Sequence, residues 1–104
     1  MLEKAIEKAA CKWAEEHGWY HRKMKHPGTR GALDRIFHKL AKTVYIEFKQ
    51  PGGRLSIHQL NEIKELETHF IQYAVVESVK SAKDFLTLCD PETYGVTTPP
   101  EEGD

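Results

Sequence analysis

The sequence has 104 residues, of which 39% are hydrophobic and 30% are charged, which suits one globular domain with a modest core and not two. No apolar run approaches the roughly 18 residues that a membrane-spanning helix needs, and residues 1–10 lack the apolar segment of a signal peptide. Cys11 and Cys89 show no metal-binding spacing, which favours free thiols in a reducing compartment. We therefore expect a cytoplasmic protein with no membrane partner.

Charge is distributed unevenly along the chain. The formal net charge is only −1, but residues 12–54 contain 10 Lys and Arg against 4 Asp and Glu, whereas the rest of the chain contains 5 against 12. A basic centre of this kind is typical of a phosphate-binding surface, and a solvated charged face is the alternative explanation. Charge alone leaves both open.

The chain begins with a predicted helix. Residues 2–17 carry apolar side chains at the three-and-four spacing of a helix, and Gly18 is a typical C-terminal stop. Glu3 and Glu7 both fall at the margin of the apolar stripe. Either carboxylate can reach inward, or it can remain at the surface near the helix N-terminus, where the macrodipole favours it.

Three strands are predicted next. Residues 19–25 form the first, and the turn-rich loop 26–31 carries Arg30, which either contacts phosphate or is simply solvated. Residues 32–40 and 43–50 are predicted strands, the second of them rich in β-branched and aromatic side chains, and the short polar link between them predicts an antiparallel hairpin. Such a hairpin places the start of one strand beside the end of the next.

The hairpin is expected to gather three charged side chains. Side chains alternate between faces along a strand, so Glu47 and Lys49 share one face. The opposite face is apolar and consists of Val44, Ile46 and Phe48. Asp34, near the start of the neighbouring strand, should lie beside Glu47 and Lys49. Two carboxylates are hard ligands for Mg²⁺ or Mn²⁺, and an ammonium suits a reacting phosphate, so the pattern predicts a catalytic metal site.

A turn and a second helix follow the hairpin. Pro51-Gly52-Gly53 ends the strand, and Ser56 begins a helix that runs to about residue 69. The positions expected to be buried are Ile57, Leu60, Ile63, Leu66 and Phe70. Gln59 forms a capping box with Ser56, a role that needs no catalytic function.

The rest of the chain predicts a strand, a helix and a tail. Residues 71–76 form a short apolar run, expected to be a central or near-central strand covered on both faces. Ser78 can cap a last helix over residues 79–88, whose inward side chains are Val79, Ala82, Phe85 and Leu86. Residues 90–104 are rich in Pro, Gly and acids, so we expect a flexible tail after a domain of residues 1–89. The order α-β-β-β-α-β-α predicts an α/β fold with a mixed sheet flanked by helices.

These motifs, in this order, resemble the PD-(D/E)XK nuclease superfamily with its restriction-endonuclease-like core, and specifically its small virus-type replication-repair nuclease (VRR-NUC) branch. Members of that branch carry, in chain order, a Glu on the first helix, a Lys, Gly-x-Pro-Asp-Arg, Glu-x-Lys, a Pro-Gly-Gly turn and Leu-Ser-x-x-Gln. The likeness covers residues 6–85. Leu33 departs from the core motif, because the family usually has Pro there. So compact a chain resembles the phage members of the family. A protein of phage origin would be located in the cytoplasm of the host cell.

The resemblance implies roles for particular residues. It implies that one or two Mg²⁺ or Mn²⁺ ions are held by Asp34, Glu47, the backbone carbonyl of Phe48 and Glu7 in preference to Glu3. It also implies that Lys49 orients water or neutralises the phosphate, and that Gln59 lies at the edge of the active site, so Gln59 has two open roles. The cations expected to contact nucleic acid are Lys23, Lys25, Arg30, Arg35 and Arg54.

The implied activity is metal-dependent endonuclease cleavage of phosphodiester bonds in DNA. Branched DNA is the expected substrate, because the small phage members pair to resolve four-way junctions. A two-fold homodimer would also supply two centres from a short chain, and Trp19, Tyr20 and Phe37 are candidate interface residues. The alternative is a DNA-binding module with a nuclease-like fold that does not cleave.

Overall fold

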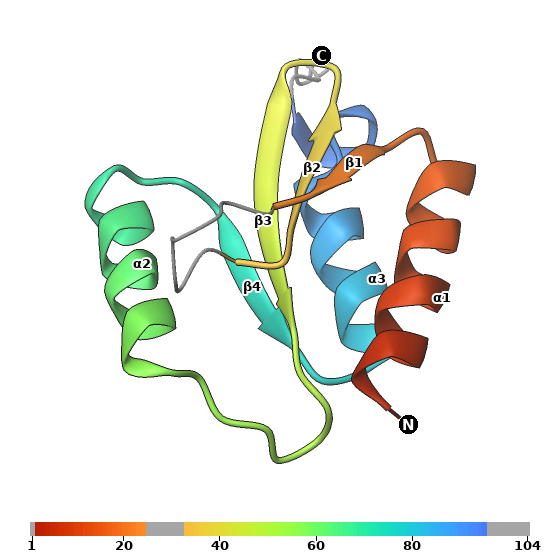
Figure 1. Cartoon of the computed structure of the whole chain (residues 1–104). Helices are drawn as coiled ribbons and strands as arrows, with labels where there is room; N and C mark the ends of the chain where they lie inside the picture. The colour runs from red at the N-terminus through yellow and green to blue at the C-terminus, as the bar shows by residue number, and fades with distance from the viewer. Residues whose placement is uncertain (1, 25–32, 96–104) are drawn as a thin grey trace.

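The computed structural model describes residues 2–24 and 33–95 (Figure 1). In chain order the elements are α1 (Glu3–Glu16), β1 (Tyr20–Lys23), β2 (Arg35–Lys39), β3 (Lys42–Phe48), α2 (Ile57–Thr68), β4 (Tyr73–Val76), α3 (Val79–Cys89) and a π-helical turn, η1 (Pro91–Gly95). The predicted order α-β-β-β-α-β-α is confirmed. The expected nucleic-acid contacts Lys25 and Arg30 lie outside the described residues. Within the described ranges, no helix is long and apolar enough to cross a membrane.

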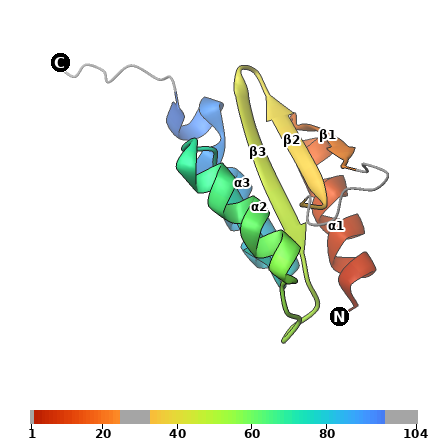
Figure 2. The same cartoon turned by 60° about the vertical axis from the view of Figure 1, so that its left-hand side comes forward.

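The four strands form one mixed sheet in the order β1-β2-β3-β4. β1, β2 and β3 are antiparallel neighbours (Figure 2), and β4 pairs with β3 in parallel. A parallel pair needs a crossover connection, which α2 supplies. The expectation that residues 71–76 form a central strand is wrong, because β4 is an edge strand and Val75 is 38% exposed. A short apolar run does not reveal whether a further strand will pair beside it.

The main core lies between one face of the sheet and the helices α1 and α3 (Figure 1). The predicted alternation along β3 is confirmed, since its fully buried side chains on this face are Val44, Ile46 and Phe48. The helices contribute Ile6, Ala10, Ala14, Ala82 and Leu86. Burial of a large apolar side chain such as Ile46 or Phe48 stabilises the fold by about 1.5–3 kcal/mol.

Two of the three aromatic residues expected at a dimer interface are core residues instead. Trp19 and Phe37 are 3% and 0% exposed, whereas Tyr20 is 58% exposed. Phe37 pairs with Val44 across the hairpin and therefore points to the same apolar face. The backbone N–H of Trp19 donates to the carbonyl of Ala14, which folds this residue back under α1. The expected interface at Trp19 and Phe37 is therefore wrong.

The opposite face of the sheet is covered by α2 only in part. A second, smaller core there contains Leu33, Ile63 and Leu66, with Tyr45, Leu55 and Tyr73 at its margin. The prediction of burial is wrong at three positions, because Ile57, Leu60 and Phe70 are 64%, 44% and 92% exposed. Helical spacing does not show how wide a stripe the partner surface covers. Phe70, with a φ of +58°, lies beyond the end of α2 and faces solvent.

A buried lysine joins the C-termini of α1 and α3 to the sheet. Lys39 is 7% exposed, and its ammonium donates to the His17 carbonyl at 2.7 Å, to Asp90 Oδ2 at 2.8 Å and to Glu92 Oε1 at 2.9 Å. His17 caps α1 and Asp90 caps α3, so the cation lies where both helix dipoles are negative. Gly18 has a φ of +88°, and a Cβ added there would lie 3.2 Å from Lys39 Cε. Glycine thus permits both the turn and this close approach.

The folded chain extends beyond the expected domain boundary at residue 89. Asp90 is buried, its Oδ1 accepts the backbone N–H of Glu92 at 2.8 Å, and η1 packs against α3. Burial raises the pKa of Asp90, but the hydrogen bonds from Lys39 and the Glu92 backbone outweigh burial and leave the pKa lowered. Composition alone predicts a tail here because it cannot show that one acid meets a distant buried cation. Residues 96–104 lie outside the described residues.

Removing the Asp90 carboxylate should destabilise the fold far more than removing its exposed neighbour. Asp90→Asn leaves Lys39 buried without its closest anion, so we expect the free energy of unfolding to fall by about 2–4 kcal/mol. Glu92→Gln is the matched change on the same ammonium. Because the Glu92 side chain is 65% exposed, its loss should cost less than about 1 kcal/mol. Urea unfolding measures both, and equal losses would contradict the role given to Asp90.

Candidate active site

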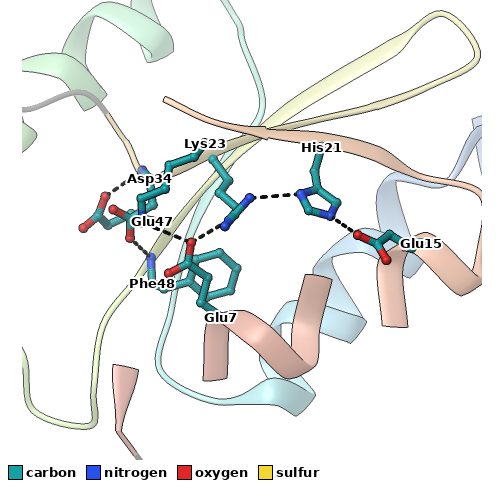
Figure 3. Close-up of polar contacts among 8 residues, drawn as sticks. Glu7, Glu15, His21, Lys23, Asp34, Glu47 and Phe48 are labelled. Atoms are coloured by element: carbon teal, nitrogen blue, oxygen red, sulfur yellow. Dashed lines mark hydrogen bonds and ion pairs between the residues drawn. The ribbon is translucent and has the colours of Figure 1, made fainter. Parts of the chain in front are cut away.

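Each of the two acids in the predicted metal site accepts a backbone N–H from the chain segment that carries the other acid. Asp34 lies one residue before β2, and the pairing of Arg35 with Ile46 sets Asp34 opposite Glu47 on β3. The Asp34 backbone N–H donates to Glu47 Oε1 at 3.0 Å, and the Phe48 backbone N–H donates to Asp34 Oδ2 at 3.0 Å (Figure 3). The structure thus brings the acids together as the hairpin predicts, although Asp34 precedes its strand instead of lying within it.

Both acids lie where ionisation is unfavourable. Glu47 is 2% exposed, and burial together with the negative charge of Asp34 raises its pKa to about 7, against the opposing effect of Lys49. Burial also raises the pKa of Asp34; the Phe48 N–H opposes this, and the Glu7 carboxylate adds to it. The acids share a poorly solvated space and repel each other when charged. A divalent cation bound by them would stabilise both ionised forms.

Gln59 performs the capping role and also contacts the site. Its Oε1 accepts the Ser56 backbone N–H at 2.9 Å, and its own backbone N–H donates to Ser56 Oγ at 3.0 Å, which completes the capping box. Its Nε2 donates to Glu47 Oε2 at 2.8 Å. The two open roles are therefore compatible, because the amide has one end for each. The N-terminus of α2 is tied directly to a site carboxylate.

Lys49 directly follows β3 and lies close to the same carboxylate. Its ammonium is 3.4 Å from Glu47 Oε2, and its side chain is 16% exposed. The turn that begins at Pro51 closes over the Lys49 stem, because a Cβ added at Gly53 would lie 3.0 Å from the Gln50 carbonyl oxygen and 3.3 Å from Lys49 Cβ. Glycine at position 53 lets this turn close and so restricts where the ammonium can lie.

Of the two candidate carboxylates on α1, Glu7 is the one that faces the site. Glu7 is 7% exposed, and its Oε2 accepts from Arg35 Nε at 2.5 Å and from Lys23 Nζ at 3.4 Å. Glu3, by contrast, has no ion pair with any residue in the described ranges. Two of the expected nucleic-acid contacts, Lys23 and Arg35, therefore hold Glu7. Arg54, the third described one, is exposed between β3 and α2.

A chain of polar contacts continues from Arg35 along α1 and β1 (Figure 3). Arg35 Nη1 lies 3.1 Å from His21 Nδ1, and His21 Nε2 lies 2.6 Å from Glu15 Oε2. Arginine can only donate, so Nδ1 accepts and Nε2 carries the hydrogen donated to Glu15. No motif in the sequence singles out His21 or Glu15, and the pairing of β1 with β2 brings them into line with Arg35.

The structure groups three cations on α1, of which the charge distribution along the chain reveals only Lys12. Lys4, Lys8 and Lys12 lie on α1 and line a groove of about 550 Å³ together with Lys23 and Arg35. Along the chain the basic region begins at Lys12, which assigns most of α1 to an acidic flank. The signal that could have found these lysines is their i, i+4 spacing, which sets all three on one face of a helix.

The site offers oxygen donors to a metal ion. Within residues 2–24 and 33–95, no group of three or more His, Cys, Asp or Glu is arranged to hold a metal ion. Asp34 and Glu47 nevertheless fit Mg²⁺ or Mn²⁺, since such ions prefer carboxylates, and Mg²⁺ commonly needs only one or two of them besides water. Burial raises both pKa values, with a further contribution from Asp34 for Glu47 and from Glu7 for Asp34, and such an ion would relieve this cost of ionisation. The Phe48 carbonyl and Glu7 stay predicted ligands.

The resemblance of this chain to a known protein is found by comparing structures. No protein-family model and no curated protein matches it. A solved structure described as "VRR_NUC domain" matches 81% of this chain and 92% of its own length, with a TM-score of 0.74 and 24% sequence identity. The resemblance expected from the motifs is thereby confirmed at the level of fold. The chain has the α/β fold of a VRR_NUC domain, with a mixed four-stranded sheet flanked by helices.

Proposed function

We propose that the protein is a metal-dependent endonuclease that hydrolyses phosphodiester bonds in DNA. The observation that carries the proposal is the reciprocal bonding that holds Asp34 and Glu47 at fixed positions beside the Lys49 ammonium. A carboxylate whose pKa is raised by burial costs free energy when it ionises, and a bound cation would offset that cost, which supports a metal-binding role for the pair. The VRR_NUC fold supports the same class of activity.

In the proposed enzyme, Asp34 and Glu47 hold Mg²⁺ or Mn²⁺, with the Phe48 carbonyl as a further oxygen ligand. When bound, such an ion polarises the phosphate and lowers the pKa of a coordinated water. Glu7 is the remaining candidate ligand. Its Oε2 is already shared by two cations, which leaves Oε1 for such a role.

Other side chains position these acids and meet the phosphate. Gln59 is held by the Ser56 backbone and donates to Glu47 Oε2, so it keeps the Glu47 carboxylate in one orientation. The Lys49 ammonium, held close to Glu47, neutralises developing charge on the phosphate or orients the attacking water. The Lys23 side chain is 44% exposed and can meet a phosphate while it remains near Glu7.

The proposed substrate is branched DNA, such as a four-way junction, and the proposed working unit is a two-fold homodimer. Symmetric cutting of two strands needs two centres at a fixed separation, and closed two-fold pairing is the commonest way to obtain them. Exposed apolar side chains that could support an interface lie on and beside α2 and β4, namely Ile57, Leu60, Phe70, Ile71 and Val75.

Neutralising either carboxylate should abolish cleavage and leave DNA binding intact or tighter. Asp34→Asn or Glu47→Gln removes a ligand charge but no cation, so we expect the cleavage rate to fall by at least about 100-fold. Asp84→Asn is the matched control, because this exposed acid of α3 pairs with Lys80 away from the site, and it should cleave like wild type. Gel assays on linear and four-way DNA with Mg²⁺, Mn²⁺ or EDTA measure cleavage.

Two results would contradict this assignment. Undiminished cleavage by Asp34→Asn would show that the reaction takes place elsewhere. Metal-independent binding of DNA by the wild-type protein, with no cleavage of any substrate in either metal, would identify the non-cleaving DNA-binding module instead.

Stability should fall as the pH rises through the range in which Glu47 ionises. Its pKa is raised from 4.5 to about 7 in the folded protein, so the folded state retains a proton that the unfolded state releases. This stabilisation is complete below pH 4.5 and is lost as the pH rises to about 7, with a slope of at most about 1.4 kcal/mol per pH unit. Urea unfolding in EDTA over this range measures the slope.

Glu47→Gln is the control for this pH dependence, because its amide does not titrate. The difference in slope between wild type and the variant separates the contribution of Glu47 to the pH dependence of stability from the contributions of the histidines and other acids. Mg²⁺ should flatten the wild-type curve, since the ion binds the charged carboxylates. Identical slopes for the two proteins in EDTA would show that the Glu47 pKa is not raised.

Mixing active and inactive subunits should distinguish a dimer from a monomer. A mixed dimer of wild-type and Asp34→Asn chains has one working centre, so it should nick a cruciform plasmid without linearising it. Light scattering after gel filtration gives the mass, to which each chain contributes 12.0 kDa. Linearisation in simple proportion to wild-type content, together with the mass of one chain, would rule out the dimer.

A further inference from the structure

A basic groove adjoins the candidate active site between α1 and the strands β1 and β2. It has a volume of about 550 Å³, and its cationic lining side chains are Lys4, Lys8, Lys12, Lys23 and Arg35. The acids in its wall are Glu7 and Glu15. The groove is a concave surface on which cations outnumber acids, which favours an anionic occupant.

Both acids of the groove have partners other than the lysines on α1. The Glu7 carboxylate is bound by Arg35 and Lys23, and Glu15 is bound by His21. Lys4, Lys8 and Lys12 form no ion pair with any residue of the described ranges, whereas Lys80 on α3 pairs with Asp84 at 2.7 Å. Three free ammonium groups therefore remain along one side of the groove.

The arrangement of the α1 lysines works against helix stability. Like charges at i, i+4 repel each other, so each of the two neighbouring pairs costs about 0.2–0.5 kcal/mol. Lys4 also lies in the first turn, where the positive end of the helix dipole disfavours a cation. The same positive dipole attracts an anion, so the features that are unfavourable for the isolated helix all favour phosphate binding.

The groove and the candidate active site share residues. Glu7, Lys23 and Arg35 line the groove, and Glu7 and Lys23 both influence the charge of Asp34. A chain of phosphates that enters the groove would therefore lead to the two carboxylates. From Lys4 to Lys12 the helix rises about 12 Å, which matches about three to four nucleotides of a duplex strand at 3.4 Å each.

We propose that this groove binds the phosphate backbone of the DNA on one side of the cleaved bond, with Lys4, Lys8 and Lys12 as its contacts. The inference rests on the proposed endonuclease function and assigns a substrate-binding surface to it. Lysine ammonium groups act as point charges without the planar fork of arginine, so they bind successive phosphates without reading the bases. Binding through this groove is therefore independent of sequence and sensitive to salt.

The test compares two triple variants that remove the same charge. The first is Lys4→Gln with Lys8→Gln and Lys12→Gln, and the control is Lys64→Gln with Lys80→Gln and Lys83→Gln on α2 and α3. Both are made in the Asp34→Asn background and assayed in EDTA, so that DNA is bound and not cut. Fluorescence anisotropy with a labelled linear duplex and a labelled four-way junction gives Kd over a range of salt concentrations.

The α1 triple variant should bind both DNAs at least about tenfold more weakly, and the slope of log Kd against log salt should fall by about 0.9 for each phosphate that the variant no longer neutralises. The control should bind within about twofold of its parent with an unchanged slope. Circular dichroism should show equal helix content, because glutamine is a good helix former and removing like charges relieves α1.

The outcomes separate this inference from the proposed function. Cleavage by wild type together with an unchanged salt slope in the α1 triple variant overturns the groove and leaves the endonuclease standing. Absence of cleavage together with a reduced slope removes the endonuclease and supports the groove as a DNA-binding surface. Binding of anionic lipid vesicles or polyglutamate with no binding of either DNA overturns the groove proposal.

Discussion

The register of the β2–β3 hairpin is the constraint on which the site depends. Because Arg35 lies opposite Ile46, Asp34 meets Glu47 and Phe48, and two backbone N–H groups become donors to the two acids. A slip of β3 by one residue would turn its apolar side chains out of the core and turn Glu47 to the opposite face, away from Asp34. Burial of the apolar face therefore sets the register, and the register sets the position of the acids.

The three acids at this end of the hairpin differ in how many cations neutralise them. Glu47 is met on the α2 side by Gln59 and Lys49, whereas Glu7 on the α1 side is met by two cations. Asp34 lies between them, bound by a backbone N–H, and its pKa is raised by burial and by the Glu7 carboxylate. The acids therefore favour a cation close to Asp34, and the unpaired lysines of α1 favour an anion beside it. A metal ion and a phosphate together would satisfy both.

Parts of the site could be predicted because they obey local rules. Capping chemistry predicted the Gln59 contact with Ser56, and strand alternation predicted that Glu47 and Lys49 share a face. Helical spacing alone left Glu3 and Glu7 open, the family resemblance favoured Glu7, and in the structure it is Glu7 that meets Arg35. The exposure of Phe70 could not be predicted either, since helical spacing says nothing of how far the partner surface extends.

By itself the sequence determined the order of the elements, the apolar face of β3 and the acids that meet across the hairpin. Those features follow from periodicity and turn chemistry, which act between near neighbours. Only the tertiary structure decided that β4 lies at the sheet edge, that Lys39 meets Asp90, and that the lysines of α1 share a groove with Lys23. These contacts join residues far apart in the chain, and the packing of helices on the sheet brings them together in a way that no local pattern encodes.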